Sequence, residues 1–182
     1  MQIPYTIIRS SRKTLSLKIR PDGSVLVRAP RRLSERIIRE FVASREHWLR
    51  SKLRKFENRP SLPPLTAQEL DALKRQARED LSRRAADWAP RVGVTFGNIA
   101  IRSQRTRWGS CSGQGNLNFN CLLMLAPEPV RDYVVIHELC HRKHMDHSPA
   151  FWAEVARVCP DYPRHRKWLK DNGSALIARL GE

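Results

Sequence analysis

The chain has 182 residues and a mass of 21.1 kDa, which is typical of one domain, or of one domain with an extension, and excludes several large domains. Hydrophobic residues make up 41% of the sequence, enough for a core, so wholesale disorder is excluded. The net charge is +16 and the isoelectric point is about 10.8, which favours anionic partners or a strongly solvated surface. No stretch approaches the roughly 18 apolar residues of a membrane span, and the beginning of the chain lacks the apolar core of a signal peptide. We therefore expect a cytoplasmic protein.

The first sixty residues are predicted to form a basic β-hairpin followed by a helix. Apolar and polar side chains alternate over residues 14–20, and a Pro-Asp-Gly turn then leads into an apolar run at 25–27, which is the pattern of a hairpin. Residues 5–8 could add a third strand. From Ser34, a residue type that caps helices, apolar side chains recur at helical spacing to about Asn58, which predicts one continuous helix.

The positive charge is concentrated in this first part of the chain. Residues 1–65 hold 16 basic and 5 acidic residues, and the proline-rich stretch 59–64 cannot be helical. The sequence thus predicts a basic module over residues 1–60, a linker over 61–65 and a core over 66–182. The module could bind a nucleotide or a nucleic acid, although charge that is scattered over several faces more often serves solubility.

The core begins with the clearest helix signal in the chain. Thr66 and Glu69 have the spacing of a capping box, and a regular apolar stripe follows until Pro90, which should end the helix. Strands are expected at 99–102 and 117–120, on either side of a loop at 108–113. Prolines at positions 127 and 129 open another helix. The four cysteines form no Cys-x-x-Cys pair, which predicts reduced thiols.

Residues 137–141 read His-Glu-x-x-His. On a helix the two histidines lie four residues apart and share one face, where both can bind a single metal ion. Glu138 lies beside that face, so it is better placed to accept a proton from a metal-bound water than to be a ligand. The apolar run at 134–136 indicates a buried helix that can hold both imidazoles rigidly.

A catalytic zinc site usually takes three protein ligands and leaves one position open, so a third ligand is needed. His144 on a continuous helix would lie about 10 Å along the axis from His137. The sequence Ser148-Pro149 starts a new helix, and the turn before it can bring His147 back to the ion. His147 is therefore the expected third ligand. The spacing matches the metzincin pattern, but His144 replaces its glycine and no methionine follows His147, which excludes a metzincin.

Three ordered blocks of the sequence resemble a known family. They are Arg107-Trp108-Gly109-Ser110-Cys111-Ser112, the stretch 132–141 around the histidine motif, and the stretch 143–148 followed by Phe151-Trp152. Together they resemble the YgjP-like metallopeptidases (the DUF45 group), which are related to the SprT-like and minigluzincin zincins. The resemblance covers nearly the whole chain.

The resemblance implies an α+β fold. In it a basic hairpin and helix precede a zincin-like metallopeptidase core, with the active-site helix under a small sheet. It also implies one Zn²⁺ per chain at His137, His141 and His147, with Glu138 as the general base and a peptide or protein as the substrate.

Three functions remain open at this point. Zinc-dependent hydrolysis of peptides is the first. The second is hydrolysis of nucleoside triphosphates by the same metal, a pyrophosphatase activity in which Arg105 and Arg107 hold phosphates. The third is a nucleic-acid-binding module with a structural metal, whose coordination would be closed. Trp108 could line the substrate cleft or pack over the core, and both arginines could bind substrate or simply be solvated.

Overall fold

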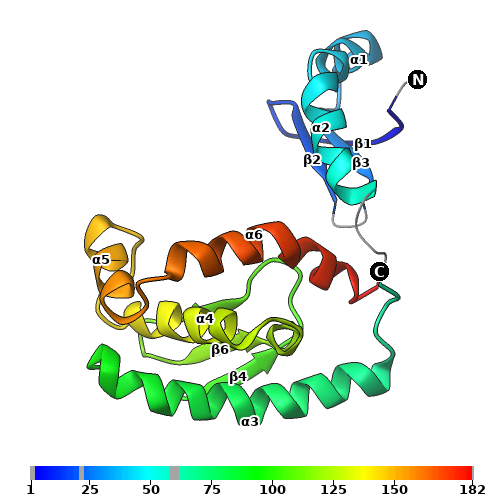
Figure 1. Cartoon of the computed structure of the whole chain (residues 1–182). Coiled ribbons are helices and arrows are strands. Elements are labelled where there is room, and N and C mark those ends of the chain that lie inside the picture. Colours follow the sequence, from blue (N-terminus) through cyan, green and yellow to red (C-terminus); the bar gives the residue numbers. More distant parts are fainter. Residues whose placement is uncertain (1–2, 21–22, 58–61, 182) are drawn as a thin grey trace. The chain divides into compact units, whose positions relative to one another are not determined.

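The computed structural model describes residues 3–20, 23–57 and 62–181. The chain divides into two compact units, Met1–Leu62 and Pro63–Glu182, and each contains one three-stranded sheet with helices (Figure 1). The predicted α+β class is confirmed. Within the described ranges, no helix is long and apolar enough to cross a membrane.

The sheet of the first unit has the strand order β1-β3-β2. Strand β1 (Tyr5–Ser10) pairs in parallel with β3 (Val25–Pro30), whereas β2 (Ser16–Ile19) pairs with β3 in antiparallel register. The strands β2 and β3 occupy the two arms expected for a hairpin, and residues 21–22 of its turn lie outside the described part. The possible third strand is present as β1.

Two helices follow, where the sequence predicted one. Helix α1 covers Glu35–Ala43 and α2 covers Glu46–Glu57, so the prediction of a continuous helix over 34–58 is wrong; its expected end, Asn58, is outside the described residues. The Ser44 hydroxyl donates a 2.8 Å hydrogen bond to the Phe41 carbonyl, a local bond of the kind that competes with helix continuation. The expected cap is correct, since the Ser34 side chain accepts from the Ile37 N–H.

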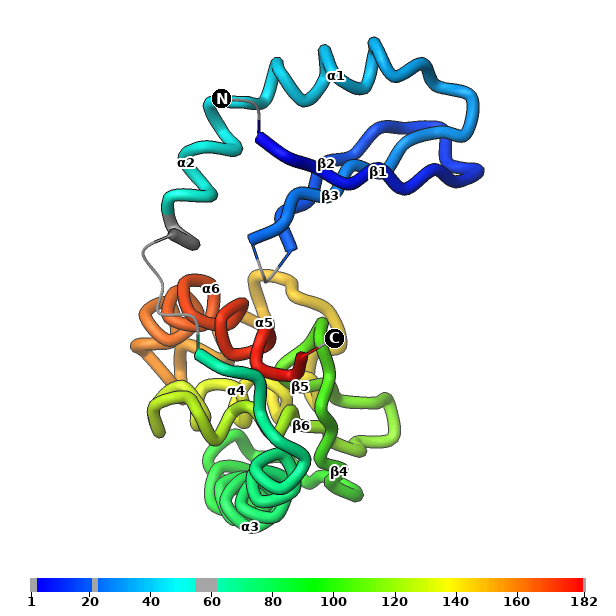
Figure 2. Tube along the Cα trace, turned by 90° about the vertical axis from the view of Figure 1, so that its right-hand side faces the viewer, coloured from blue at the N-terminus to red at the C-terminus, as the bar shows by residue number. Residues whose placement is uncertain are grey.

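The helices of this unit cover one face of its sheet. Figure 2 shows α1 running along the three strands. Alternate residues of β3 (Val25, Val27, Ala29) pack with Ile38, Val42 and Leu49 in a small buried core. Every second residue of this strand and the apolar stripe of the helices therefore form one core.

The second unit begins with an extended segment and the longest helix, α3 (Ala67–Val92). Residues 59–61 of the proline-rich stretch lie outside the described residues. Further on, the Leu65 N–H donates to the Arg179 carbonyl at 2.7 Å. The capping box is confirmed, because Thr66 and Glu69 exchange both hydrogen bonds.

Helix α3 does not stop at Pro90, contrary to the prediction. It continues to Val92 and is ended by Gly93 in the left-handed conformation, with φ of 79°. A proline lacks an N–H donor and crowds the carbonyl four residues before it, so its effect falls on the preceding turn and does not end the helix at position 90. Glycine adopts the left-handed cap without steric cost, which makes Gly93 the true end signal.

The sheet of the second unit has the order β4-β6-β5. Strands β4 (Ile99–Arg102) and β6 (Leu117–Asn120) pair in parallel where strands were expected. The stretch 108–113 is not wholly a loop, because β5 (Gly109–Cys111) lies within it and pairs in antiparallel register with β6. The short 3-10 helix η1 (Cys121–Leu125) then leads to α4.

Helix α4 (Glu128–Cys140) lies between α3 and α6 (Tyr162–Ala178), with α5 (Pro149–Val158) at one end of the unit (Figure 1). Its residues Val134, Val135, Ile136 and Leu139 are buried in the main core. This burial holds the helix that carries the histidine motif firmly in place.

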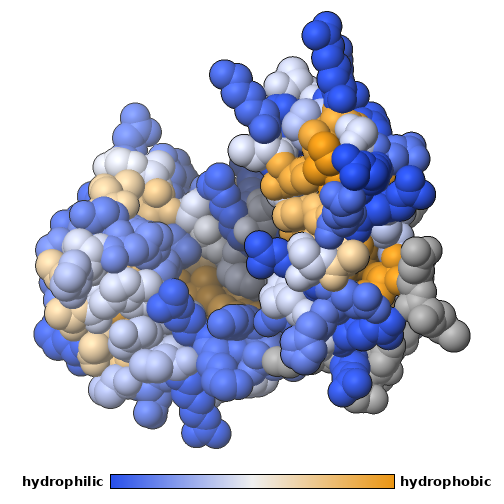
Figure 3. All heavy atoms as spheres, turned by 90° about the horizontal axis from the view of Figure 1, so that it is seen from above, coloured by the Kyte–Doolittle hydropathy of each residue, from blue (hydrophilic) through white to orange (hydrophobic). Residues whose placement is uncertain are grey.

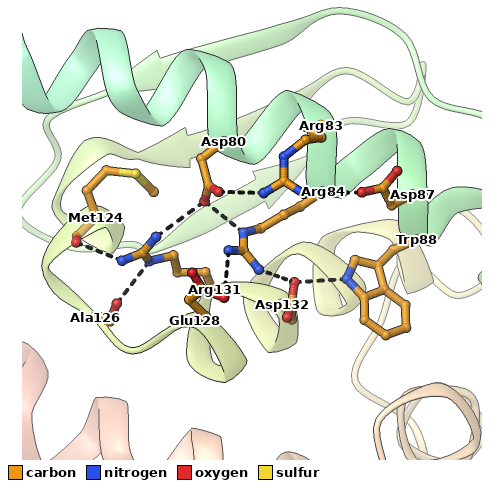
Figure 4. A network of polar contacts seen from close by, with 10 residues as sticks. All are labelled: Asp80, Arg83, Arg84, Asp87, Trp88, Met124, Ala126, Glu128, Arg131 and Asp132. Atoms are coloured by element: carbon orange, nitrogen blue, oxygen red, sulfur yellow. Dashed lines mark hydrogen bonds and ion pairs between the residues drawn. The ribbon is translucent and has the colours of Figure 1, made fainter.

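A partly buried network of charges also joins α3 to α4 (Figure 4). The Asp132 carboxylate accepts hydrogen bonds from Arg84 at 2.7 Å and from the Trp88 indole at 2.9 Å. Arg84 is buried and also donates to Asp80 at 2.7 Å, and the two carboxylates raise its pKa further. Asp80 in turn lies 3.6 Å from Arg131. Each buried charge is therefore paired, as low polarity requires.

The outer surface is mainly polar. Figure 3 shows a face on which hydrophilic residues dominate, in keeping with the 29% of charged residues in the sequence. The large apolar side chains that remain exposed in the described ranges are few: Ile8, Ile37, Trp48, Leu62 and Met145. Isolated exposed apolar side chains of this kind are normal for a folded protein.

Candidate metal centre

Three histidines converge at the end of α4. His137 lies in its last turn, and His141 directly follows it with helical dihedral angles, so the spacing of four places both rings on one face. His147 comes from the segment between α4 and α5, because the chain turns back before the cap at Ser148. The candidate ligand nitrogens of all three lie within 4.8 Å of one another. The predicted turn therefore brings His147, and not the His144 ring, to the pair.

The donor set and its spacing fit a zinc ion. The Nε2 atoms of His137 and His147 are 3.2 Å apart. Two nitrogens that each lie about 2.05 Å from one tetrahedral ion are separated by about 3.3 Å. Imidazole nitrogen is a preferred zinc ligand, and the rings of His137 and His141 are perpendicular, with centroids 4.9 Å apart. Three such ligands would leave room for a fourth.

The surroundings of His137 and His141 favour the neutral form of these two imidazoles. Burial is the main cause that lowers the pKa of His137 to about 3, with the neighbouring His141 and His147 acting in the same direction. Burial also lowers the pKa of His141. Because only the neutral ring has a lone pair to give to a metal, the site favours the form that binds.

Packing and one hydrogen bond orient the rings. His141 Nδ1 lies 2.9 Å from the His144 carbonyl oxygen, and an N–H at this position would leave Nε2 free for a metal. Phe151 of α5 stacks on His141 with centroids 4.5 Å apart and meets His137 edge-on at 4.9 Å. Nδ1 of His137 is buried and lacks a hydrogen-bond partner among the described residues. The phenyl ring therefore does much of the positioning.

Glu138 is buried beside the triad. Its exposed fraction is 5%, and burial raises the pKa of its carboxyl to about 8, an effect that the charge of Arg107 opposes. The backbone of Gly109, at the start of β5, lies against this carboxyl group. A carboxylate held in such an apolar place is a stronger base than one in water.

The other predicted site residues are placed less centrally. Trp108 is half-buried and packs against the main core, and its ring lies against Gly173 of α6, which supports the packing interpretation. Arg107 is exposed, and its charge reaches Glu138. Arg105 is exposed as well, and among the described residues no carboxylate pairs with it. Cys140 is buried in the core, as its place on the helix predicts.

A group of aromatic rings beside the triad was not part of the predicted site. Trp152 of α5 lies 5.7 Å from His137 and 5.8 Å from His147, and Tyr162 stacks on it at 5.2 Å. Tyr133, one turn before His137, meets that ring at 5.9 Å. Tyr133 had a sequence signal in its spacing of four from His137, and Trp152 belongs to the third of the sequence blocks. Tyr162 had none, since it comes from a later helix that the fold brings back.

This arrangement of imidazoles, with a buried carboxylate beside them on the same helix, is that of a metallopeptidase. The model of the YgjP-like metallopeptidase domain matches residues 13–70 and 66–172. The chain therefore belongs to the YgjP-like metallopeptidase family, and the family expected from the three sequence blocks is confirmed.

Two solved structures resemble parts of the chain. The metallopeptidase zymogen abylysin of Pyrococcus abyssi is 26% identical, with a TM-score of 0.42 over 50% of this chain and 91% of that one. The zymogen jannalysin of Methanocaldococcus jannaschii is 18% identical, with a TM-score of 0.41 over 48% of this chain and 94% of that one. A comparison with curated proteins gave no match.

Proposed function

We propose that this metallopeptidase binds one Zn²⁺ through His137, His141 and His147 and uses Glu138 as its general base. The observation that carries the proposal is the convergence of three imidazole nitrogens within 4.8 Å next to a buried carboxyl group. Three neutral nitrogen ligands with an open fourth position are typical of catalytic zinc.

Zinc at this place would lower the pKa of a water molecule and polarise the carbonyl group of the scissile peptide bond. The chain's own residues do the rest. Glu138, buried next to the ligands, accepts the proton of the attacking water and then delivers that proton to the leaving amine. Phe151 covers the rings of His137 and His141 and keeps other water away from them.

The sheet offers a way to align an extended peptide. Strand β5 is at an edge of its sheet, and its first residue, Gly109, lies against Glu138. A substrate that paired with this edge would run past the general base, and its main chain would be bound without regard to sequence. We propose this as the mode of peptide binding.

The basic first unit is proposed to bind an anionic partner, since residues 1–65 carry most of the net charge. Lys18 and Arg28 are exposed on β2 and β3. Reversing both charges should weaken binding to nucleic acid at low salt and leave zinc content unchanged. Equal binding by the wild-type and reversed proteins would identify the charge as a solubility feature.

The test of the peptidase site is Glu138→Gln, an isosteric change that removes the base. The variant should keep its zinc and its fold and lose roughly a thousandfold or more in peptide hydrolysis. Zinc-loaded wild type and variant are compared on a panel of peptides and nucleoside triphosphates. Loss of zinc together with activity would make Glu138 structural, and hydrolysis of nucleotides alone would favour the pyrophosphatase.

A further inference from the structure

Beside the metal centre lies an arginine, Arg166, that has no role in the proposed mechanism. Arg166 lies in the second turn of α6, and its guanidinium carbon is 4.7 Å from the centroid of the Trp152 ring. That same ring lies 5.7 Å from His137 and 5.8 Å from His147. One indole therefore separates the guanidinium from two of the three imidazoles.

The aromatic group fixes this arginine in place. Trp152 is held by Tyr162, which stacks on it with an interplanar angle of 19°, and by Phe151, which meets it edge-on at 5.1 Å. A cation over an indole is attracted by the negative face of the ring. The guanidinium is thus positioned by its flat face, while the N–H groups around its rim stay available.

Those N–H groups have no acceptor within the described ranges. The exposed Arg166 makes none of the hydrogen bonds or ion pairs found there, whereas Arg157, on the neighbouring α5, bonds to Glu154 at 2.7 Å. Arg84 is likewise paired with two carboxylates. The guanidinium of Arg166 is therefore held in place while its positive charge is left without a carboxylate partner. This is expected of a residue that binds an anion.

Its charge lies close to the site. The Trp152 ring contacts the guanidinium on one side and lies within 6 Å of the His137 and His147 rings. An anionic group bound at Arg166 would lie beside the reacting bond.

We propose that Arg166 binds a carboxylate group of the peptide substrate next to the metal centre, so that the enzyme prefers substrates with a negative charge beside the cleaved bond. This inference rests on the peptidase function proposed above. The carboxylate could be the free carboxyl terminus of a peptide or the side chain of an aspartate or glutamate, and a guanidinium binds either in a two-pronged manner.

The test uses the zinc-loaded full chain and three matched peptides. The first has a free carboxyl terminus, the second is the same peptide with an amidated terminus, and the third is amidated but carries glutamate in place of a glutamine near the cleaved bond. Arg166→Gln is compared with wild type. Arg78→Gln is the control, since it removes one exposed positive charge from α3 of the same unit.

For whichever carboxylate source is bound, Arg166→Gln should lower kcat/KM by about 10- to 100-fold. For the amidated neutral peptide, Arg166→Gln should change kcat/KM by less than about threefold. Arg78→Gln should change kcat/KM by less than about threefold for each of the three peptides. Arg166→Lys should recover part of the loss. A uniform fall for all three peptides would overturn the proposal, since it would mean that Arg166 acts on the reacting bond and not on a substrate charge.

A binding measurement separates this inference from the peptidase function. In the Glu138→Gln background, calorimetry should show that the preferred carboxylate peptide binds at least about tenfold more tightly than its neutral partner, and that Arg166→Gln abolishes the difference. If no peptide is cleaved but this difference is present, the peptidase proposal fails and the carboxylate site stands. If peptides are cleaved and the difference is absent, the carboxylate site is wrong.

Discussion

The backbone of Gly109 lies directly against the carboxyl group of Glu138. A β-carbon at position 109 would be 2.6 Å from Glu138 Oε1 and 2.7 Å from Cγ, which is closer than atoms can pack. Gly109 is not among the glycines with positive φ, so the backbone there could accept alanine. The glycine is therefore required by its neighbour, the proposed general base.

Gly109→Ala should push the Glu138 carboxyl group away from its position. We expect kcat/KM for a peptide to fall about 10- to 100-fold, because small displacements of a general base are costly, while zinc content stays at the wild-type level. Gly113→Ala is the matched control, since a β-carbon there meets nothing within 4 Å. Equal activity of the two variants would show that Glu138 tolerates the shift.

His147→Ala should lose zinc, whereas His144→Ala should retain it. The His147 ring supplies the third nitrogen of the cluster, and removing one of three ligands should weaken zinc binding by at least about a hundredfold. His144 contributes its backbone carbonyl to His141, which the alanine variant keeps. Elemental analysis of the purified proteins decides between them, and the reverse pattern would refute the ligand assignment.

Gly173→Ala should destabilise the protein, although alanine is the better helix former. A β-carbon at position 173 would lie 2.8 Å from Cζ2 of Trp108. We expect a net loss of about 1 kcal/mol in the free energy of unfolding, against a gain of up to about 1 kcal/mol from helix propensity alone.

The variant Trp108→Leu provides the check on that cause. In this background the clash is gone, so Gly173→Ala should become neutral or stabilising, as a double-mutant cycle in urea would reveal. If alanine destabilises both backgrounds equally, the tryptophan is not responsible for the glycine.

The stability of the protein should depend on pH through Glu154, which links α5 to the turn before it. Hydrogen bonds from Arg157, together with Lys143 at 2.7 Å, lower the pKa of Glu154 from 4.5 to about 2. A carboxyl whose pKa is lower in the folded state contributes stability above its unfolded pKa, and this contribution disappears as the pH falls towards the folded value.

Glu154→Gln should therefore be less stable than wild type at pH 7, by roughly 1 kcal/mol for such partly exposed ion pairs. The difference in Tm between the two proteins should shrink between pH 5 and about pH 2. Thermal unfolding of both proteins across this range measures it. A constant gap would contradict the role of the ion pairs.

Local signals in the sequence predicted most of the elements that hold the site. The cap at Ser34, the capping box at Thr66 and the start of α5 at Ser148 each depend on a few neighbouring residues, and each is present. The spacing of the histidine motif likewise gave the shared face of His137 and His141. Such features need no knowledge of distant contacts.

What the sequence did not reveal depends on distant contacts or on weak competing bonds. The break between α1 and α2 comes where the Ser44 hydroxyl bonds to the Phe41 carbonyl, and strand β5 forms by pairing with β6. Gly109 lies in the stretch predicted as a loop, and nothing in the sequence indicates that Glu138 packs against it. Arg166 gave no signal at all, since its position over Trp152 follows from how α5 and α6 pack.

The charged network between α3 and α4 determines how α4 is aligned along α3. The buried stripe of α3 repeats a small or branched apolar residue every four positions, at Leu73, Ala77, Leu81, Ala85 and Ala89. A stripe this regular would look nearly the same to α4 after a slip of four residues, about 6 Å.

Asp132 removes that degeneracy. It accepts hydrogen bonds from Arg84 and Trp88, which stand one turn apart on α3, so a slipped helix would separate the buried guanidinium from one of its two carboxylates and leave the indole N–H without its acceptor. Because Asp132 lies on the same helix as His137, the network also fixes the position of the histidines along the axis of α3. The residues that set this position are more than 40 positions away in the sequence.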